Sequence, residues 1–429
     1  MDKQKKEEVK RVVLFLSVWT GFLLFLDLAT GVSWFHSGDF SYRTAMAYHG
    51  LLIPVWMFLL LAFSDEIPES FLRRRTLVVG VLSASVLTGA ASLFIRQKGI
   101  SFPTVILVSG LVIAEITALV VLIGALRAYR VSSEKKPVNR LAWTTVFIAL
   151  AGMSLATPAG HLVGAFQDAE QWFSGWAAHF QTDSLTDAHS HQMLASLLAA
   201  AFALPFLKKT GTEQKRVWRL QNTGLILIMV ATLAQIAIYQ ASAWVGWEPP
   251  VLFSHGLNGV PLDDAVLSVL GMGMLMLVPG LWIKTKDKTV SPTKTVIINR
   301  LLAVLLLSYL MSVVVLGIYI EFHEPFFGQA AGNAPGVPND LAFIRGHLLL
   351  GFMLIPVMTG VLLNTHRFAF SGNSLFVVSV LLVVTSGVAG IFLWTFGLHP
   401  VLMQVAVYLT IVFLWLSAYL FWLDEKETA

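Results

Sequence analysis

The sequence predicts an all-α, polytopic membrane protein of twelve transmembrane helices, and three observations predict it. Of the 429 residues, 56% are hydrophobic and only 13% are charged, about half of the charged share of a soluble globular protein. Long apolar stretches recur between charged or Pro/Gly-rich loops, and Lys and Arg gather in alternate loops. This composition excludes a soluble single-domain enzyme and a disordered chain.

Twelve apolar segments are each long enough to cross a hydrocarbon core of about 30 Å as an α-helix. They are continuous runs, without the alternation of a β-barrel strand, so helices are favoured. We expect one transmembrane domain over residues 1–429. Its predicted segments are 12–31, 43–63, 76–95, 102–126, 141–165, 188–207, 217–245, 262–283, 298–320, 340–364, 373–396 and 400–423.

The positive charges give the predicted orientation. When the first segment enters from the cytoplasm, 25 of the 29 Lys and Arg residues lie on the cytoplasmic side and four on the outer side. Such a bias is the positive-inside rule. We therefore expect a multi-pass protein of the inner (cytoplasmic) membrane with both termini in the cytoplasm. The net charge of +4 reflects this sidedness, so the expected surroundings are lipid bilayer and not nucleic acid.

The chain contains no cysteine. This excludes disulfides, iron–sulfur clusters, thiolate-ligated haem and covalently attached c-type haem, because each of them needs Cys. A dinuclear copper site of the thiolate kind is excluded for the same reason. Histidine is then the main strong ligand that the chain can offer to a metal.

Ten of the eleven histidines fall at the outer ends of segments or in outer loops in this topology. Three of them, His49, His191 and His347, lie one to two turns inside a segment, with spacings of 142 and 156 residues. The second segment of each group of four thus carries a His at one depth. This pattern indicates a threefold internal repeat of four helices. The repeat units are approximately 12–126, 141–283 and 298–423.

Histidines at one depth on facing helices have a specific chemical use. Haem iron takes two axial nitrogens on opposite faces of the macrocycle, and two imidazoles placed in this way supply them. A copper ion would instead need three or four clustered histidines. The alternative is that each His is an ordinary polar residue at the membrane interface.

Two local strings resemble a known family. TAMAYHGLLIPVWMF around His49 and IRGHLLLGFMLIPVMTG around His347 are similar to helices 2 and 10 of the catalytic, haem-binding subunit I of haem–copper oxidases and nitric oxide reductases. The resemblance in helix number covers nearly the whole chain, whereas the motifs are confined to the segments with His49, His191 and His347. It implies three pseudo-symmetric arcs of four helices, with His49 and His347 as axial ligands of a low-spin haem b.

The chain departs from this family in ways that bear on activity. Arg345 stands where the family has the ligand of its catalytic haem, and segment 217–245 lacks the His pair that binds copper. Segment 262–283 also lacks the lysine of the family's proton path. Copper and a normal dinuclear oxygen-reducing site are therefore not expected. The resemblance implies electron transfer near the outer face, with one haem b or two.

His189 and His191 leave a second function open. Their His-x-His arrangement at the start of a segment can hold a second haem or a metal, which would give a divergent oxygen or nitric oxide reductase with a rearranged site. His189 can instead be a first-turn residue that faces water. A third possibility is a non-haem transporter, although carriers usually place their polar groups at the membrane midplane. Whether the protein is an enzyme, an oxidoreductase of this type, stays open.

Three charged residues near these segments have candidate roles. Arg345 and, less strongly, Arg43 can pair with haem propionates, since a guanidinium binds carboxylates in a bidentate manner. Arg345 can instead form a salt bridge with Asp340. Glu115, in the middle of segment 102–126, can serve a proton route or a quinol site, or can be a protonated structural acid.

The expected partners follow from the missing cysteines. Without a c-type haem or thiolate copper site, the chain cannot collect electrons through such a centre of its own. Electrons are therefore expected to come from quinol, or from a partner cytochrome or another respiratory-chain subunit.

Overall fold

The structure is a computed structural model and describes residues 42–64, 67, 71–93, 102–131, 139–166, 183–207, 215–245, 247, 249–255 and 258–282. The chain divides into two compact units, residues 53–280 and residues 1–52 with 281–429. Helix α2 (Tyr42–Ser64) crosses this boundary. The unit of residues 53–280 carries nearly all of the described residues.

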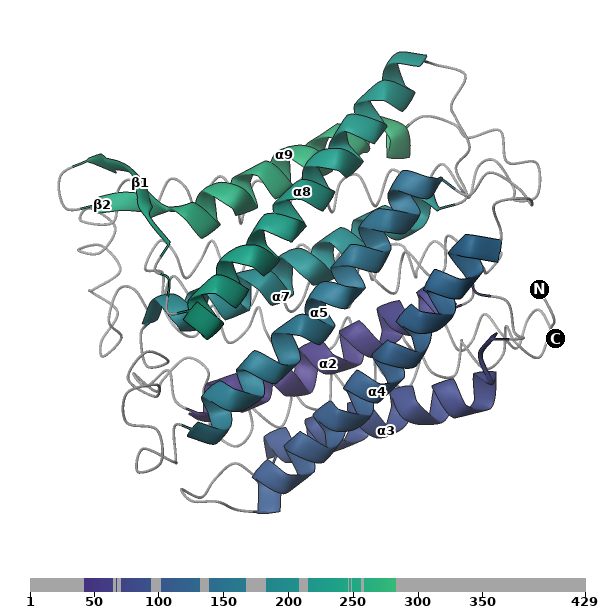
Figure 1. The fold of residues 1–429 in the computed structure, drawn as a ribbon, viewed down its shortest axis with the longest axis vertical. Helices are drawn as coiled ribbons and strands as arrows, with labels where there is room; N and C mark the ends of the chain where they lie inside the picture. Colours follow the sequence, from purple (N-terminus) through teal and green to yellow (C-terminus); the bar gives the residue numbers. More distant parts are fainter. Residues whose placement is uncertain are drawn as a thin grey trace, which may run out of the picture. The chain divides into compact units, whose positions relative to one another are not determined.

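The described residues are helical apart from one short hairpin (Figure 1). Seven α-helices, one 3-10 helix and two strands make up this part of the chain. After α2 they are α3 (Arg74–Leu93), α4 (Phe102–Val131), α5 (Arg140–Phe166), α7 (Asp183–Ala203), η3 (Leu204–Phe206), α8 (Lys215–Val245), β1 (Val251–His255), β2 (Asn258–Pro261) and α9 (Leu262–Trp282).

These helices confirm the second to eighth predicted segments, with ends that differ by at most five residues. The largest differences are at the start of α7 and the end of α4, where polar residues continue the helix beyond its apolar part. Hydropathy locates the apolar stretch, whereas backbone hydrogen bonding continues into polar sequence. The remaining five segments lie outside the described residues, so twelve spans in three arcs stay a prediction. They are 12–31, 298–320, 340–364, 373–396 and 400–423.

The hairpin is a correction to the all-helical prediction. β1 and β2 are antiparallel, with Val251 opposite Pro261 and Leu252 opposite Val260. The short apolar run VLFSH lies between a Pro pair and a Gly-rich turn, which is a weak strand signal. Strands of four and five residues leave no mark in a hydropathy window of membrane-spanning length.

Three described helices are long and apolar enough to cross a membrane: Val105–Arg130, Arg140–Pro158 and Lys215–Val245. The outward face of α4 is a stripe of large apolar side chains. Val105, Val112 and Ile116, for example, are exposed by 60%, 48% and 57%. A continuous apolar stripe of this kind is typical of a lipid-facing helix and would be unusual on a soluble protein. This composition is consistent with a membrane protein.

Helices α3 and α4 pack closely through small residues. A Cβ added at Gly110 would lie 2.8 Å from Thr88 Cγ2 and 3.0 Å from the backbone nitrogen of Thr88, and a Cβ at Gly80 would contact Thr117. The two contacts run in opposite directions along the helices, as expected for an antiparallel pair. Each threonine hydroxyl donates to its own helix, Thr88 to Ala84 O and Thr117 to Ile113 O. The interface is therefore closely packed and its hydroxyls are satisfied.

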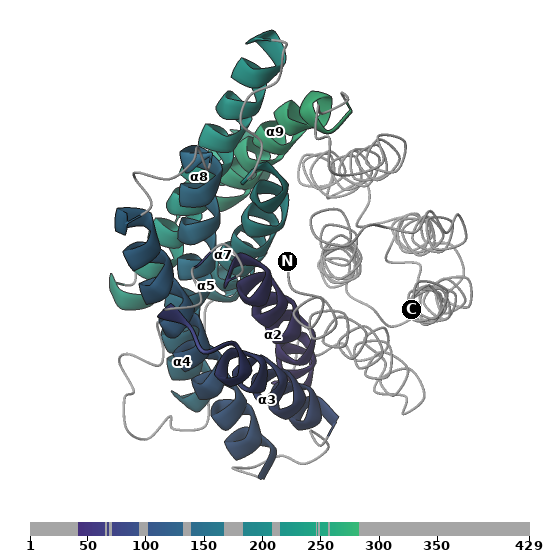
Figure 2. The ribbon, with the colours of Figure 1, turned by 90° about the vertical axis from the view of Figure 1, so that its right-hand side faces the viewer.

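Helix α5 holds the middle of the unit and packs against α4, α7 and α8 (Figure 2). Asn139 caps its start, because Asn139 Oδ1 accepts from the backbone nitrogen of Ala142 at 3.2 Å. The nitrogen of Asn139 donates to Leu207 O at 3.0 Å, which ties this end of α5 to the turn after α7. Trp143, in the first turn of α5, stacks on Tyr129 of α4 with ring centroids 4.8 Å apart.

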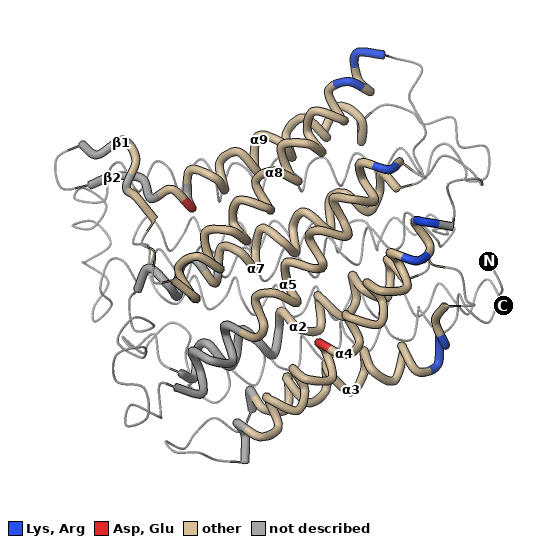
Figure 3. The backbone as a smooth tube through the Cα atoms, in the orientation of Figure 1, with Lys and Arg blue, Asp and Glu red and all other residues tan. Residues whose placement is uncertain are grey.

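The described basic side chains all lie at one end of the unit (Figure 3). Helices α3, α5 and α8 begin at this end and α4 finishes there, so the sidedness follows from alternating helix directions. Such a separation agrees with the loop asymmetry in the sequence. The residues are Arg73, Arg74, Arg75, Arg127, Arg130, Arg140, Lys215, Arg216 and Arg219.

Candidate functional site

The opposite end of the unit holds the start of α7, the end of α8 and the start of α9. Two histidines of α7, His189 and His191, lie there in its second and third turns. Residues two apart on a helix differ in direction by about 200°, so they do not face the same neighbour. The two imidazoles accordingly contact different helices.

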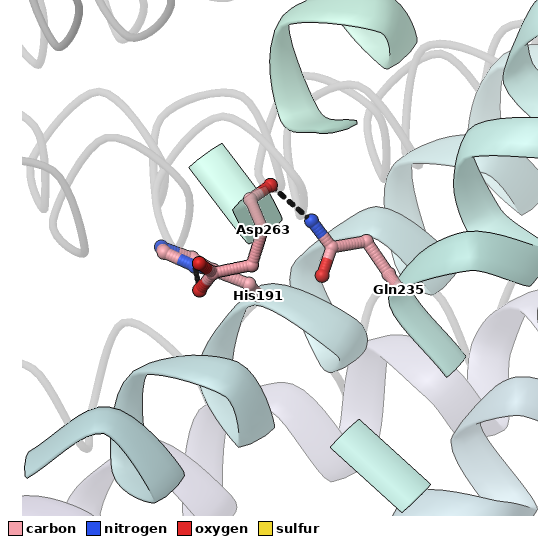
Figure 4. A network of polar contacts seen from close by, with 3 residues as sticks. All are labelled: His191, Gln235 and Asp263. Atoms are coloured by element: carbon pink, nitrogen blue, oxygen red, sulfur yellow. Dashed lines mark hydrogen bonds and ion pairs between the residues drawn. The ribbon is translucent and has the colours of Figure 1, made fainter. Parts of the chain in front are cut away.

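His191 forms a pair with Asp263 of α9 (Figure 4). The Nδ1 atom of His191 lies 2.9 Å from Oδ2 of Asp263. The side chains are 16% and 6% exposed, so both are largely shielded from solvent. An ionised carboxylate only accepts hydrogen bonds, and Nδ1 of His191 is therefore the atom that carries the hydrogen.

Asp263 is held in place by backbone contacts from two other elements. Gln235 Nε2, on α8, donates to the backbone oxygen of Asp263 at 2.5 Å. The nitrogen of the preceding residue, Leu262, donates to Pro250 O at 3.1 Å, just before the hairpin. The hairpin thus returns the chain to the end of α8, and α9 begins with Asp263 in its first turn. An acidic side chain is favourable at this position because of the helix dipole.

Helices α8 and α9 approach each other through glycine farther along. A Cβ at Gly224 would lie 2.6 Å from Gly273 O, and one at Gly273 would lie 2.8 Å from Gly224 O. Small residues of this kind let membrane helices pack closely. The Gly224–Gly273 crossing is therefore a point of close approach between α8 and α9.

The His191–Asp263 pair has the arrangement of a ligand histidine. A metal-binding imidazole usually donates its other ring N–H to a carboxylate, which fixes the tautomer and makes the ligating nitrogen more basic. With Nδ1 held by Asp263, a metal would have to be bound through Nε2 of His191.

His189 faces the protein interior. Its ring lies against Tyr239 of α8, with centroids 5.0 Å apart and planes inclined by 52°. Both of its ring nitrogens are buried. The water-facing alternative for His189 is therefore wrong. His189 and His191 approach α8 and α9 respectively, so they do not converge on one another.

The other predicted site residues are described only in part or not at all. Arg43 and His49 lie on α2, but their side chains are outside the described residues. Arg345 and His347 fall wholly outside them. The predicted ligand pair His49 and His347 therefore stays a prediction.

Glu115 lies halfway along α4 and faces α5. The hydroxyl-bearing side chains of Ser154 and Thr157 lie beside its carboxyl group. Thr157 also donates to Met153 O at 3.1 Å, and Ser154 is 6% exposed. Glu115 Oε2 and Ser154 Oγ nevertheless have no hydrogen-bond partner in the described structure, so the protonated structural acid, the proton route and the quinol site all stay predictions.

Sequence reasoning found His191 but missed Asp263, Gln235 and Tyr239, which surround the start of α7. The available signal was weak: a Gln and a Tyr four residues apart in an otherwise apolar segment, and an acidic pair that begins two residues after a proline. Among the described residues no group of three or more His, Asp or Glu side chains is placed to hold a metal ion. Within this part of the chain, His191 is a single candidate ligand.

Comparison with other proteins adds no assignment. No protein-family model, curated protein or solved structure matches the chain. The site therefore has to be interpreted from its own residues.

Proposed function

We propose that this chain is a membrane haem b protein that transfers electrons near the membrane face opposite its Lys/Arg end, with the architecture of haem–copper oxidase subunit I. The observation that carries the proposal is His191, a largely buried imidazole whose Nδ1 is held by Asp263 at 2.9 Å. A carboxylate bound to Nδ1, as Asp263 is here, is typical of a histidine that ligates a metal through Nε2.

The donor set is suited to haem rather than to a bare metal ion. A structural metal ion needs three or four protein ligands. A haem needs only one or two axial nitrogens, because the macrocycle supplies the rest. His191 offers one such nitrogen, and His49 and His347 are the proposed axial pair of a low-spin haem between the second and tenth predicted spans. When bound, the haem would supply one-electron transfer.

The charge distribution supports the proposed side of the membrane. All described Lys and Arg side chains lie at the end away from His191, and positive residues mark the cytoplasmic side. We therefore place both termini in the cytoplasm and the His191 end at the outer face of the inner membrane. Arg345 and Arg43 are proposed to pair with propionates there, and quinol or a partner cytochrome is proposed as the electron donor.

The divergent reductase is the weaker form of this proposal. It requires an open haem or metal at His189 and His191 together, yet their rings go to Tyr239 and to Asp263. A site at His191 alone needs no rearrangement of α7. The contacts of the two histidines therefore favour electron transfer over catalysis by both residues.

An absorption spectrum of the purified protein tests the proposal. We expect a Soret band and a b-type pyridine haemochrome from haem-replete cells, and we expect that carbon monoxide does not change the reduced spectrum of the six-coordinate haem held by His49 and His347. Turnover of oxygen or nitric oxide would instead favour the reductase. A colourless, metal-free preparation would overturn both and favour a transporter.

Three variants assign the ligands. The variant His191→Ala is expected to lose or shift the absorption of the haem at that site, and His49→Ala that of the low-spin haem. Asp263→Asn keeps the ligand but removes the carboxylate, so we expect haem affinity to fall by about 10- to 100-fold. His366→Ala is the control, because His366 is the one histidine on the predicted cytoplasmic side. Equal spectra for His366→Ala and His191→Ala would contradict the assignment.

A further inference from the structure

One face of α7 is polar although it is buried in the middle of the unit. His189, Gln192 and Ser196 follow one another at intervals of three and four residues, which places them on one side of a helix. Gln192 and Ser196 are both 0% exposed. Gln192 Nε2 donates to Gly152 O on α5 at 2.7 Å, so this face lies against α5.

The facing side of α8 is polar as well. Gln235 and Tyr239 are one turn apart, and both are 0% exposed. Tyr239 meets the ring of His189, which joins the polar faces of α7 and α8. Gln235 donates to the backbone of Asp263, which joins them to the His191–Asp263 pair. We call Gln192, Ser196, Gln235 and Tyr239 the polar column.

Each member of the polar column has one polar atom without a hydrogen-bond partner in the described structure. These atoms are Gln192 Oε1, Ser196 Oγ, Gln235 Oε1 and Tyr239 OH. Leaving a buried polar atom unsatisfied costs about 1–3 kcal/mol. Four such atoms on adjoining turns would cost too much without hydrogen-bond partners, so we expect a bound ligand to supply them. Two of the four atoms are amide carbonyl acceptors and two belong to hydroxyl groups.

Water is the ligand that this set of atoms fits. A buried water molecule typically makes about three hydrogen bonds to otherwise unsatisfied groups, and it both donates and accepts. The amide oxygens can accept from it, and the hydroxyls can donate to it or accept from it. No charged side chain belongs to the column, so an ion would find no counter-charge among these four residues.

Gly152 limits the space beside Ser196 on the α5 side. A Cβ at Gly152 would lie 2.5 Å from Ser196 Oγ and 2.8 Å from Ile236 Cδ1. Any larger residue at this position would push the Ser196 hydroxyl away from α5. Glycine at position 152 therefore allows the Ser196 hydroxyl to approach α5 closely.

We propose that the polar column binds internal water next to the element that carries Asp263. The column comprises Gln192 and Ser196 on α7 and Gln235 and Tyr239 on α8, and the amide nitrogen of Gln235 donates to the backbone oxygen of Asp263. This inference goes beyond the proposed electron-transfer function and does not depend on haem.

Radiolytic hydroxyl-radical labelling of the full-length protein in detergent tests it. Radicals formed in bound water oxidise the side chains next to that water even when these are buried. We expect Tyr239 to be labelled at least five-fold faster than Phe63, which is equally buried at 0% exposure and belongs to an aromatic contact with Trp143. Labelling of Tyr239 no faster than that of Phe63 would overturn the proposal.

Two variants sharpen the test. Gln192→Leu and Ser196→Ala remove polar atoms of the column, and we expect the rate of Tyr239 labelling to fall toward that of Phe63. Thr232→Val is the matched control, because Thr232 is also 0% exposed on α8 but its hydroxyl already donates to Ile228 O at 2.8 Å. An equal loss of Tyr239 labelling in Thr232→Val and Ser196→Ala would contradict a water site at the column. If the variants do not fold, the comparison of Tyr239 with Phe63 in the unmodified protein still decides.

The result is separable from the test of the proposed function. A colourless protein in which Tyr239 is labelled rapidly would overturn haem binding and keep the water site. A haem-containing protein in which Tyr239 and Phe63 are labelled equally fast would support haem binding and overturn the water site.

Discussion

The α3–α4 interface and the α7–α8 interface are both formed by antiparallel apolar helices, yet they are built differently. Between α3 and α4, glycines meet threonines, and each threonine hydroxyl donates to its own helix. Where α7 and α8 pack against each other and against α5, glutamine, serine and tyrosine side chains are buried with polar atoms unsatisfied in the described structure. The α3–α4 interface is closely packed and its hydroxyls are satisfied. The α7–α8 region contains buried polar groups that helix packing alone does not require.

This difference indicates where function resides. In a membrane, helices associate through small residues and satisfied hydroxyls, which is what α3 and α4 use. Polar side chains in a buried interface carry a cost, and a cost of that kind usually persists for a functional reason. The α7–α8 interface is also the one that leads to the His191–Asp263 pair. Substitutions in the two interfaces should therefore have different consequences.

The largest effect is expected for Gly110→Ala, at the α3–α4 interface. The new Cβ would lie 3.0 Å from the backbone nitrogen of Thr88, and backbone cannot move aside as a side chain can. The helices must separate, so we expect the free energy of unfolding to fall by about 3 kcal/mol. A denaturant titration in detergent micelles measures this.

Gly124→Ala on the same helix is the control for that substitution. Its Cβ would lie 3.4 to 3.6 Å from side-chain atoms of Leu72 and Ile67, which is ordinary contact. Replacing a helical Gly with Ala also favours the helix, so the free energy of unfolding should stay unchanged or rise. Equal losses for both variants would show that the close approach of α3 and α4 is not what matters.

The second largest effect is expected for Asp263→Asn. This change keeps the shape of the side chain but removes the charge that accepts from His191, and hydrogen bonds to charged groups contribute about 1.5–3 kcal/mol. We expect a loss of about 2 kcal/mol in the free energy of unfolding. A double-mutant cycle with His191→Gln isolates the pair, and additive losses would mean that the two residues do not stabilise one another.

A smaller loss is expected for Gly152→Ala, at the α5–α7–α8 interface. Its Cβ would meet Ser196 Oγ and Ile236 Cδ1, both of which are ends of side chains that can shift. We expect a loss of about 1 kcal/mol in the free energy of unfolding, clearly below that of Gly110→Ala. The double variant Gly152→Ala/Ser196→Ala should regain part of it, and no recovery would place the strain elsewhere.

The smallest effect is expected for Ser196→Ala alone. Its hydroxyl oxygen has no hydrogen-bond partner in the described part of the protein, so removing it breaks no hydrogen bond there. The free energy of unfolding should change by less than about 1 kcal/mol, as judged by the same titration. A much larger loss would mean that the hydroxyl is firmly bonded and that the polar column resembles the α3–α4 interface after all.

The sequence predicted the helices well because membrane-length apolar runs are a local signal. Segment 43–63 corresponds to α2 at Tyr42–Ser64, and segment 217–245 corresponds to α8 at Lys215–Val245. The hairpin of β1 and β2 was missed, since its two short strands depend on pairing with each other. Strands of this length have little periodicity to read.

The candidate site was predictable only in part. His191 stands out as an imidazole at the start of an apolar segment, but Asp263 lies 72 residues away. A single sequence holds no information that brings those two residues together. The same is true of Gln235, which looks like an isolated polar residue until its contact with the backbone of Asp263 is known.

The sequence by itself determined the class of protein, the positions of the described helices and the gathering of positive charge in alternate loops. These follow from local composition and from the length of helix that a bilayer requires. Only the tertiary structure decided that His189 turns to Tyr239 while His191 pairs with Asp263, and that polar residues of α7 and α8 share one buried interface. Such contacts depend on how helices distant in sequence rotate and cross, and small residues such as Gly224 and Gly273 set those crossings through packing, which no single segment encodes.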